Sequence, residues 1–316
     1  MATRWKQWWV RVVTFLSPPD NSEWLGILRI GLGAEVTLYC ASLWADWNYL
    51  FAGSGQAVIT RQLSEAIIST ESLAMPTVGR LVATASHFGI KEETAMLLAW
   101  GFLLGAGVFL AAGILSRASA IVAWFLHLCV AKSGGMVSYG VDSFMTIGLF
   151  YLMLAPLPDR YALDRKLWGG RALDPGRLGF FRRVLQVHLC VVYLFSGITK
   201  SLGVGWWDGS NIWRALIRPP FNILSPDLIA AWGFLLPAIG ISICLIEIGY
   251  PVLIWSKRTR GIWLALVCSM HLATGLTMGM HLFAITMIVL NVSAFGPGLR
   301  SELRASLAQA PPTLAS

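Results

Sequence analysis

The sequence has 316 residues, of which 56% are hydrophobic and only 13% are charged. Soluble domains carry about 25% charged residues, so a soluble protein of this composition would lack the polar surface to cover its core. The net charge of +8 comes from basic residues in short segments between apolar runs. No basic stripe or binding motif accompanies that charge, which argues against nucleic acid as a partner and leaves the lipid bilayer as the expected solvent.

The first 24 residues form a segment of their own. They combine the basic residues Arg4, Lys6 and Arg11 with several aromatic residues, and Pro18 and Pro19 then interrupt the pattern. This pattern differs from a cleavable signal peptide and is typical of a segment that lies at the membrane interface. We therefore predict an interfacial basic-aromatic segment over residues 1–24.

From residue 25 onward, apolar stretches of about the length of a bilayer-spanning helix alternate with polar connections. We predict an all-α membrane protein, a bundle of about eight transmembrane helices that occupies residues 25–296. The last two helices are separated by only two residues. The predicted spans are 25–43, 94–115, 118–137, 141–157, 184–199, 229–255, 261–278 and 281–295.

Two connections are too long or too rich in sequence signals to be plain turns. In the connection 46–93, the stretches 59–68 and 78–88 are expected to form short helices on the outer surface. The connection 201–228 is rich in Trp, Gly and Pro, so we expect an ordered re-entrant or capping loop. Residues 297–316 are expected to be a cytoplasmic tail, whose end is disordered.

Basic residues are divided unequally between alternate connections. Sixteen lie on the side that includes the N-terminal segment, and seven lie on the other side. Cytoplasmic connections carry an excess of Lys and Arg, so the richer side is expected to be cytoplasmic. The sequence therefore predicts a multi-pass protein of the cell's inner (plasma) membrane with both termini in the cytoplasm.

The cysteine and histidine patterns indicate no metal site. All five cysteines lie inside apolar stretches, and none forms a CxxC pair. His271 and His281 are not spaced for metal binding on one helix face. We therefore expect neither a zinc site nor a disulfide framework.

Ionisable residues inside spans cost about 2.5–3.5 kcal/mol each to insert, so each needs a structural or functional reason. Arg29 and Glu35 share the first predicted span, where a spacing of six residues places them about 120° apart around the helix. They cannot pair with one another. Each is expected to meet a polar partner elsewhere in the bundle.

Asp142 and Lys200 each allow two interpretations. Asp142 opens the fourth span, where it is either the N-cap of the helix or part of a site, or both. Lys200 ends the fifth span, where a positive charge interacts favourably with the C-terminal end of the helix dipole. The functional interpretation of Lys200 is a partly buried amine that can act as a base.

Glu247 and His271 are the most isolated polar residues. Glu247 lies in the middle of an apolar span, so it must be protonated or paired with a cation such as a histidine or Lys200. Pro251, four residues later, removes the backbone donor for the Glu247 carbonyl. His271 is also in mid-span, and we predict that it neighbours Glu247 or shares a polar cluster with it.

Three stretches resemble the horizontally transferred transmembrane domain (HTTM) family, which includes the membrane portion of vitamin K-dependent gamma-glutamyl carboxylase. They are residues 25–33 around Arg29, residues 139–144 around Asp142, and residues 193–200 with the Trp206–Trp207 pair that follows. Weaker matches lie at 247–251 and at His271. The resemblance covers most of the chain, from about residue 25 to residue 295.

The resemblance implies that Lys200 is a catalytic base for a membrane quinol on the outer side, with Asp142 where the carboxylases have a histidine. The other polar-cluster or binding candidates are Arg29, Glu35, Glu247, His271, Trp206 and Trp207. The sequence carries no large extramembrane domain of the kind with which carboxylases bind peptides.

Three function classes follow from these residues. The first is a quinol-dependent or peptide-modifying, carboxylase-like enzyme with an outward-facing site. The second is a non-enzymatic maturation, immunity or assembly factor for a secreted peptide, similar to the short bacterial sporulation-delaying toxin-maturation membrane proteins of the same family. The third is a small-molecule or proton carrier, which the buried charges suggest.

Overall fold

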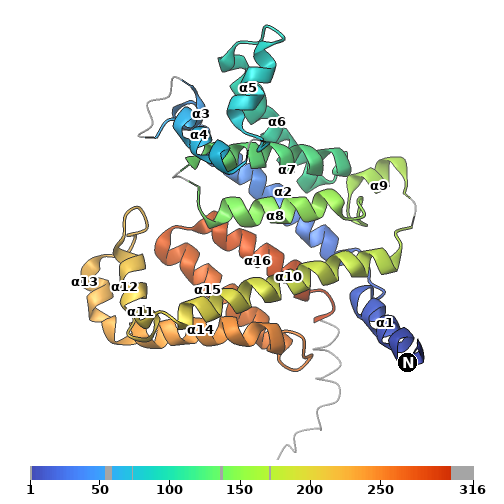
Figure 1. The fold of residues 1–316 in the computed structure, drawn as a ribbon, viewed down its shortest axis with the longest axis vertical. Coiled ribbons are helices and arrows are strands. Elements are labelled where there is room, and N and C mark those ends of the chain that lie inside the picture. The colour runs from blue at the N-terminus through green and yellow to red at the C-terminus, as the bar shows by residue number, and fades with distance from the viewer. Residues whose placement is uncertain (1, 54–58, 73, 136–137, 171, 300–316) are drawn as a thin grey trace, which may run out of the picture. The chain divides into compact units, whose positions relative to one another are not determined.

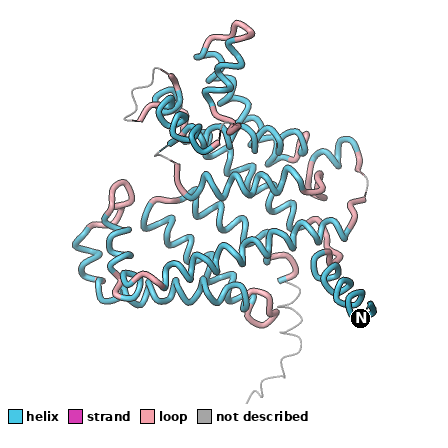
Figure 2. The backbone as a smooth tube through the Cα atoms, viewed as in Figure 1, coloured by secondary structure: helices cyan, strands magenta, loops and turns pink. Residues whose placement is uncertain are grey.

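The structure, a computed structural model, describes residues 2–53, 59–72, 74–135, 138–170 and 172–299. Throughout these ranges the regular secondary structure is helical and contains no strand (Figure 2). The predicted all-α fold class is confirmed. The predicted disordered end of the tail lies outside the described residues.

The chain divides into two compact units. The first-half unit comprises residues 25–178, and the second-half unit combines residues 1–24 with residues 179–316. Each unit is described separately below. Both contain long apolar helices together with several short helices (Figure 1).

The first-half unit places two of its short helices where the sequence predicted them, since α4 and α5 correspond to the stretches 59–68 and 78–88. Thr60 and Thr77 cap these two helices by accepting hydrogen bonds from backbone N–H groups. Helices α6, α7 and α8 pack against one another in sequence order. The helices of this unit are α2 (Glu23–Ser42, whose first two residues fall in the other unit), α3 (Trp47–Phe51), α4 (Arg61–Glu71), α5 (Val78–Ser86), α6 (Glu92–Ala112), α7 (Ser116–Ser133), α8 (Gly140–Leu154) and α9 (Leu163–Trp168).

The second-half unit contains the longest helix, α10, which begins nine residues before the predicted apolar span because its basic first turns are also helical. Helices α15 and α16 lie side by side (Figure 1), and Gly279 separates them with a positive φ of 70°. The helices of this unit are α1 (Ala2–Leu16), α10 (Pro175–Ser201), α11 (Val204–Trp207), α12 (Ser210–Ile217), α13 (Pro226–Ala231), the 3₁₀ helix η2 (Gly233–Leu235), α14 (Leu236–Leu253), α15 (Arg260–Met278) and α16 (His281–Phe295).

Five helical segments are long and apolar enough to cross a membrane. They are α2, α6, α10, η2 with α14, and α15. Helices α8 and α16 are apolar but shorter, and the predicted span 118–137 corresponds to α7, which is not among the five. Each of the eight predicted spans therefore contains a helix, while length and composition identify five of them as membrane-spanning.

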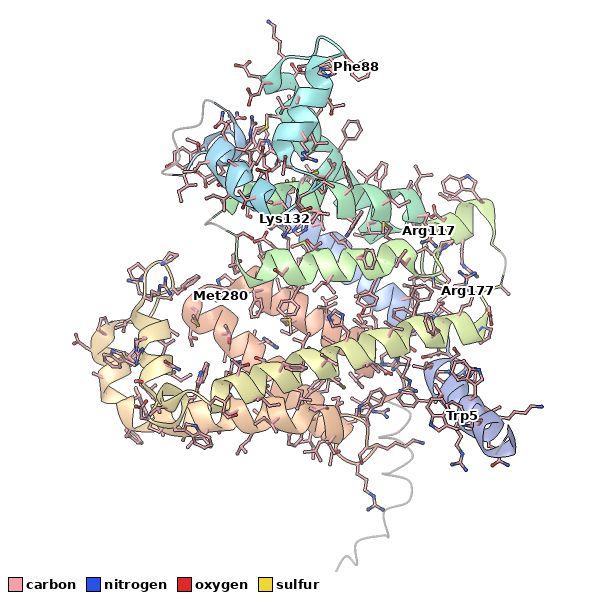
Figure 3. The ribbon with its side chains drawn as sticks, in the orientation of Figure 1. Trp5, Phe88, Arg117, Lys132, Arg177 and Met280 are labelled. Atoms are coloured by element: carbon pink, nitrogen blue, oxygen red, sulfur yellow. The ribbon has the colours of Figure 1, made fainter. Side chains whose placement is uncertain are left out.

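Large apolar side chains are exposed along these long helices. Phe102 on α6, Val252 on α14 and Leu276 on α15 are each at least 60% exposed. A soluble protein would bury such residues, whereas lipid solvates them at little cost. On α1, Trp5 is 70% exposed (Figure 3). These exposed surfaces indicate a helical membrane protein.

Candidate functional site

The main candidate site is an ion pair between α10 and α14 in the second-half unit. Lys200 Nζ lies 2.5 Å from Glu247 Oε1. The Lys200 side chain is 25% exposed, and that of Glu247 is 4% exposed. The second carboxylate oxygen of Glu247, Oε2, is buried and has no hydrogen-bond partner among the described residues. Of the alternatives that the sequence left open for Glu247, the structure shows pairing with Lys200.

A glycine allows the two helices to approach closely enough for this contact. A Cβ atom at Gly197 would lie 2.8 Å from Cγ1 of Ile248 and 3.0 Å from Cβ of Glu247. Such distances are too short for a larger residue, so α10 needs glycine here to pack on α14. Lys200 follows less than one turn later, which brings its amine to the carboxylate.

Trp206 on the short helix α11 covers the amine. Lys200 Nζ lies 5.1 Å from the centre of the Trp206 ring, within the range of a cation–π interaction. A Cβ atom at Gly240 of α14 would lie 2.2 Å from the Trp206 carbonyl oxygen, so α11 rests directly on α14. Trp207 instead donates its indole N–H to the Ser201 carbonyl at 2.8 Å. Trp206 therefore contacts the amine, while Trp207 holds α11 to the end of α10.

The connection after Lys200 is ordered, as predicted, and consists of the short helices α11, α12 and α13. Between α11 and α12, Gly209 has a φ of 79° and packs against Leu236 and Pro237 at the start of α14. Hydrogen bonds from the backbone and side chain of Ser210 lower the pKa of Asp208. This exposed carboxylate therefore stays charged beside the site at neutral pH.

A second polar group lies among α10, α14, α15 and α16. Tyr193 Oη is 2.7 Å from His271 Nε2, and the Asn291 amide donates to Tyr193 Oη at 2.8 Å. Tyr250 donates to Asn291 Oδ1 at 2.7 Å. The second amide hydrogen of Asn291 goes to the Met287 carbonyl. Tyr193 Oη accepts from Asn291, so its own proton is available to His271 Nε2, and in that arrangement the imidazole proton is on Nδ1.

Glu247 and His271 therefore bond different residues. Glu247 bonds Lys200, and His271 bonds Tyr193, so the direct partners are two residues of α10. Lys200 nevertheless lies close enough to His271 to interact with it electrostatically. Within the described part of the chain, no hydrogen bond joins Glu247 to His271, and the two residues belong to different hydrogen-bonded groups.

Asp142 belongs to a separate polar cluster in the first-half unit. It is the third residue of α8, so the N-cap is Tyr139, and Asp142 accepts from the Tyr139 N–H at 2.9 Å. Tyr39 of α2 donates to the other carboxylate oxygen at 2.9 Å. Burial raises the pKa of Tyr139, and the nearby Asp142 and Glu35 raise it further. Asp142 thus closes the first turn of α8 and also bonds to α2.

His127 adds an imidazole to that cluster. Its ring lies 5.1 Å from the ring of Tyr39, and its Nδ1 is 3.0 Å from the Thr146 hydroxyl. Its Nε2 is buried, and no residue in the described ranges forms a hydrogen bond with it. Glu35, on the same helix as Tyr39, is completely buried.

Arg29 is a structural clamp. Its Nε is 2.5 Å from Asp159, and its Nη1 donates at 2.7 Å to the carbonyls of Leu110 and Ala111. These carbonyls lie in the last turn of α6, and that of Leu110 also accepts from the Gly113 N–H at 3.1 Å. Arg29 and Asp159 are both 0% exposed, so the charges neutralise one another in the interior. Arg29 therefore joins α2, the end of α6 and the loop after α8.

No family model, curated protein or solved structure matches this chain. Across the described ranges, no three His, Cys, Asp or Glu residues lie close enough together to bind a metal ion. Sequence reasoning identified Lys200, Glu247, His271 and Trp206 but missed Tyr250 and Asn291. An asparagine within the apolar stretch 281–295 was the available signal for Asn291.

Proposed function

We propose that this chain is an HTTM-family membrane enzyme that removes a proton from the hydroxyl group of a membrane quinol, with Lys200 as the base. The observation that carries this proposal is the 2.5 Å contact between Lys200 Nζ and Glu247 Oε1 beneath the Trp206 ring. An ionisable pair within a span is costly to maintain, which favours a functional reason for it.

The pair can hold its proton in two ways. With the proton on Lys200, the contact joins an ammonium to a carboxylate. With the proton on Glu247, the amine is neutral and can accept a proton from a hydroxyl group. The neutral form also avoids burying a charged carboxylate whose Oε2 has no partner. For Lys200 to act as a base, the shared proton must therefore be on Glu247 when the substrate hydroxyl arrives.

The geometry around the amine suits a flat aromatic substrate. Lys200 is partly exposed while Glu247 is almost completely buried, so a substrate approaches from the lysine side. The indole of Trp206 presents an aromatic face beside the amine. A quinol ring can stack on that face while its hydroxyl points to Nζ.

Turnover of a soluble quinol tests this function. The purified protein in lipid nanodiscs is supplied with a reduced short-chain naphthoquinone, and oxygen uptake is measured. Because the quinol anion reacts with oxygen faster than the neutral quinol, a proton acceptor should raise uptake above that of empty nanodiscs. Uptake equal to that of empty nanodiscs, with no quinone extracted from the purified protein, would contradict the proposal.

The proposal places the site on the outer side of the inner membrane, because the basic residues favour cytoplasmic termini. A reporter that is active only in the periplasm should give a strong signal when fused after Ser201. Fused after Leu299, it should give none. The reverse pattern would show that Lys200 faces the cytoplasm.

A further inference from the structure

An apolar groove lies in the second-half unit, away from the Lys200 pair. It has a volume of about 350 Å³. Every residue that lines it is apolar, and they come from α1, α10 and the end of α14. The lining includes Phe15, Val187, Val191, Leu194, Pro251 and Trp255.

Arg183 and the groove together extend along α10 over about the thickness of one leaflet of a bilayer. Arg183 lies at the predicted membrane boundary of α10, and Leu194 is eleven residues further along the helix. At 1.5 Å per residue, the helix rises about 16 Å between them. Half of a hydrocarbon core is about 15 Å thick. The groove residues of α10, from Val187 to Leu194, cover about 10 Å of this rise, so relative to the predicted boundary they lie at the depth of one leaflet's acyl chains.

A guanidinium group stands at the headgroup end of this groove. The Arg183 guanidinium lies 4.7 Å from the centre of the Phe15 ring and 4.8 Å from that of Trp255. Its Nε donates to the Phe15 carbonyl at 2.9 Å, and its Nη1 donates to Gln186. The same two aromatic residues line the groove, so the charge sits directly at its opening.

The charge at this opening is unbalanced. Arg183 interacts electrostatically with Arg182, Arg260 and Asp20. Asp20 is already bonded to Arg182 at 2.8 Å. The Asp20 carboxylate is thus shared with Arg182, and within the described part of the chain no salt bridge joins a carboxylate to Arg183. An anion is the complementary partner.

We propose that this groove binds one anionic phospholipid of the cytoplasmic leaflet, with its phosphate at Arg183 and an acyl chain along α10. A guanidinium forms strong paired hydrogen bonds with phosphate oxygens. The apolar lining takes the chain without leaving polar groups unsatisfied. Exposed tryptophans on α1, such as Trp5 and Trp9, are of the residue type that anchors proteins in the membrane interface. This proposal does not depend on the function of Lys200.

Native mass spectrometry of the full chain tests this site with two lipids that share the same acyl chains. Phosphatidylglycerol is anionic, whereas phosphatidylcholine has no net charge. The wild-type protein should retain phosphatidylglycerol preferentially. Arg183→Gln should reduce this preference about fivefold, since one cation near a membrane surface contributes about 1 kcal/mol. Arg183→Lys should keep most of the preference because it keeps the charge.

Two further variants complete the experiment. Arg177→Gln removes an exposed charge from the same helix (Figure 3) and should leave the preference unchanged. Val191→Trp fills the groove from a side chain that is 45% exposed and should reduce retention of both lipids. Equal preference in Arg183→Gln and the wild type would overturn the proposal. Displacement of phosphatidylglycerol by an equal amount of uncharged isoprenoid quinone would overturn it too.

Discussion

Replacing Arg29 by methionine should lower the free energy of unfolding by about 3–5 kcal/mol, which is the typical cost of removing one partner of a buried ion pair. Asp159 would remain as an uncompensated charge that is 0% exposed. The carbonyls of Leu110 and Ala111 would also lose the guanidinium as a donor, although that of Leu110 would keep the Gly113 N–H. Unfolding of the detergent-solubilised protein, followed by circular dichroism in increasing denaturant, measures the loss.

Two companion variants make this measurement specific. Arg214 is an exposed arginine on α12, so Arg214→Met should change stability by no more than about 0.5 kcal/mol. Adding Asp159→Leu to the Arg29 variant removes the uncompensated charge and should restore much of the lost stability. Equal free energies of unfolding for Arg29→Met and Arg214→Met would contradict the structural role of Arg29.

Lys200→Arg should reduce quinol-dependent oxygen uptake by about 10²–10⁴-fold, the usual contribution of a general base. Arginine keeps the positive charge near Glu247 and Trp206, but it does not release its proton at working pH. Folding and membrane insertion should therefore be retained while turnover is lost. The uptake assay in nanodiscs gives the rate, and the unfolding assay checks the fold.

The matched control for this variant is Lys132→Arg. Lys132 lies in the last turn of α7 (Figure 3), where it also combines a cation with a helix C-terminus. The same substitution there should leave oxygen uptake unchanged. Full activity in Lys200→Arg would mean that Lys200 serves only the helix dipole and the ion pair.

The sequence predicted the features that depend on neighbouring residues, such as a run of apolar residues or an isolated charge within one. Apolar runs located a helix in every predicted span, and the isolation of Glu247 predicted that it needs a partner. The break before α14 was missed because residues 229–240 are apolar throughout. The local signals there are Gly233 and the proline at the first turn of α14, and they divide the segment into α13, η2 and α14.

Partners that are distant in sequence could not be predicted. Arg29 pairs with Asp159, which lies 130 residues away in a connection that gave no sign of being buried. His271 bonds Tyr193 because α10 and α15 both reach the polar group around Asn291. Spacing along one helix shows which residues share a face. Choosing among candidates on other helices requires the packing itself.

The most direct test of the central claim is the rate of quinol-dependent oxygen uptake by the double variant Lys200→Met/Glu247→Leu. Replacing a buried ion pair by apolar residues of similar size is often neutral or stabilising, so the variant should fold. If the Lys200–Glu247 pair has only a structural role, its replacement should leave turnover unchanged. If Lys200 is the base, the folded double variant should have no more uptake than empty nanodiscs. Uptake at the wild-type rate would contradict the account.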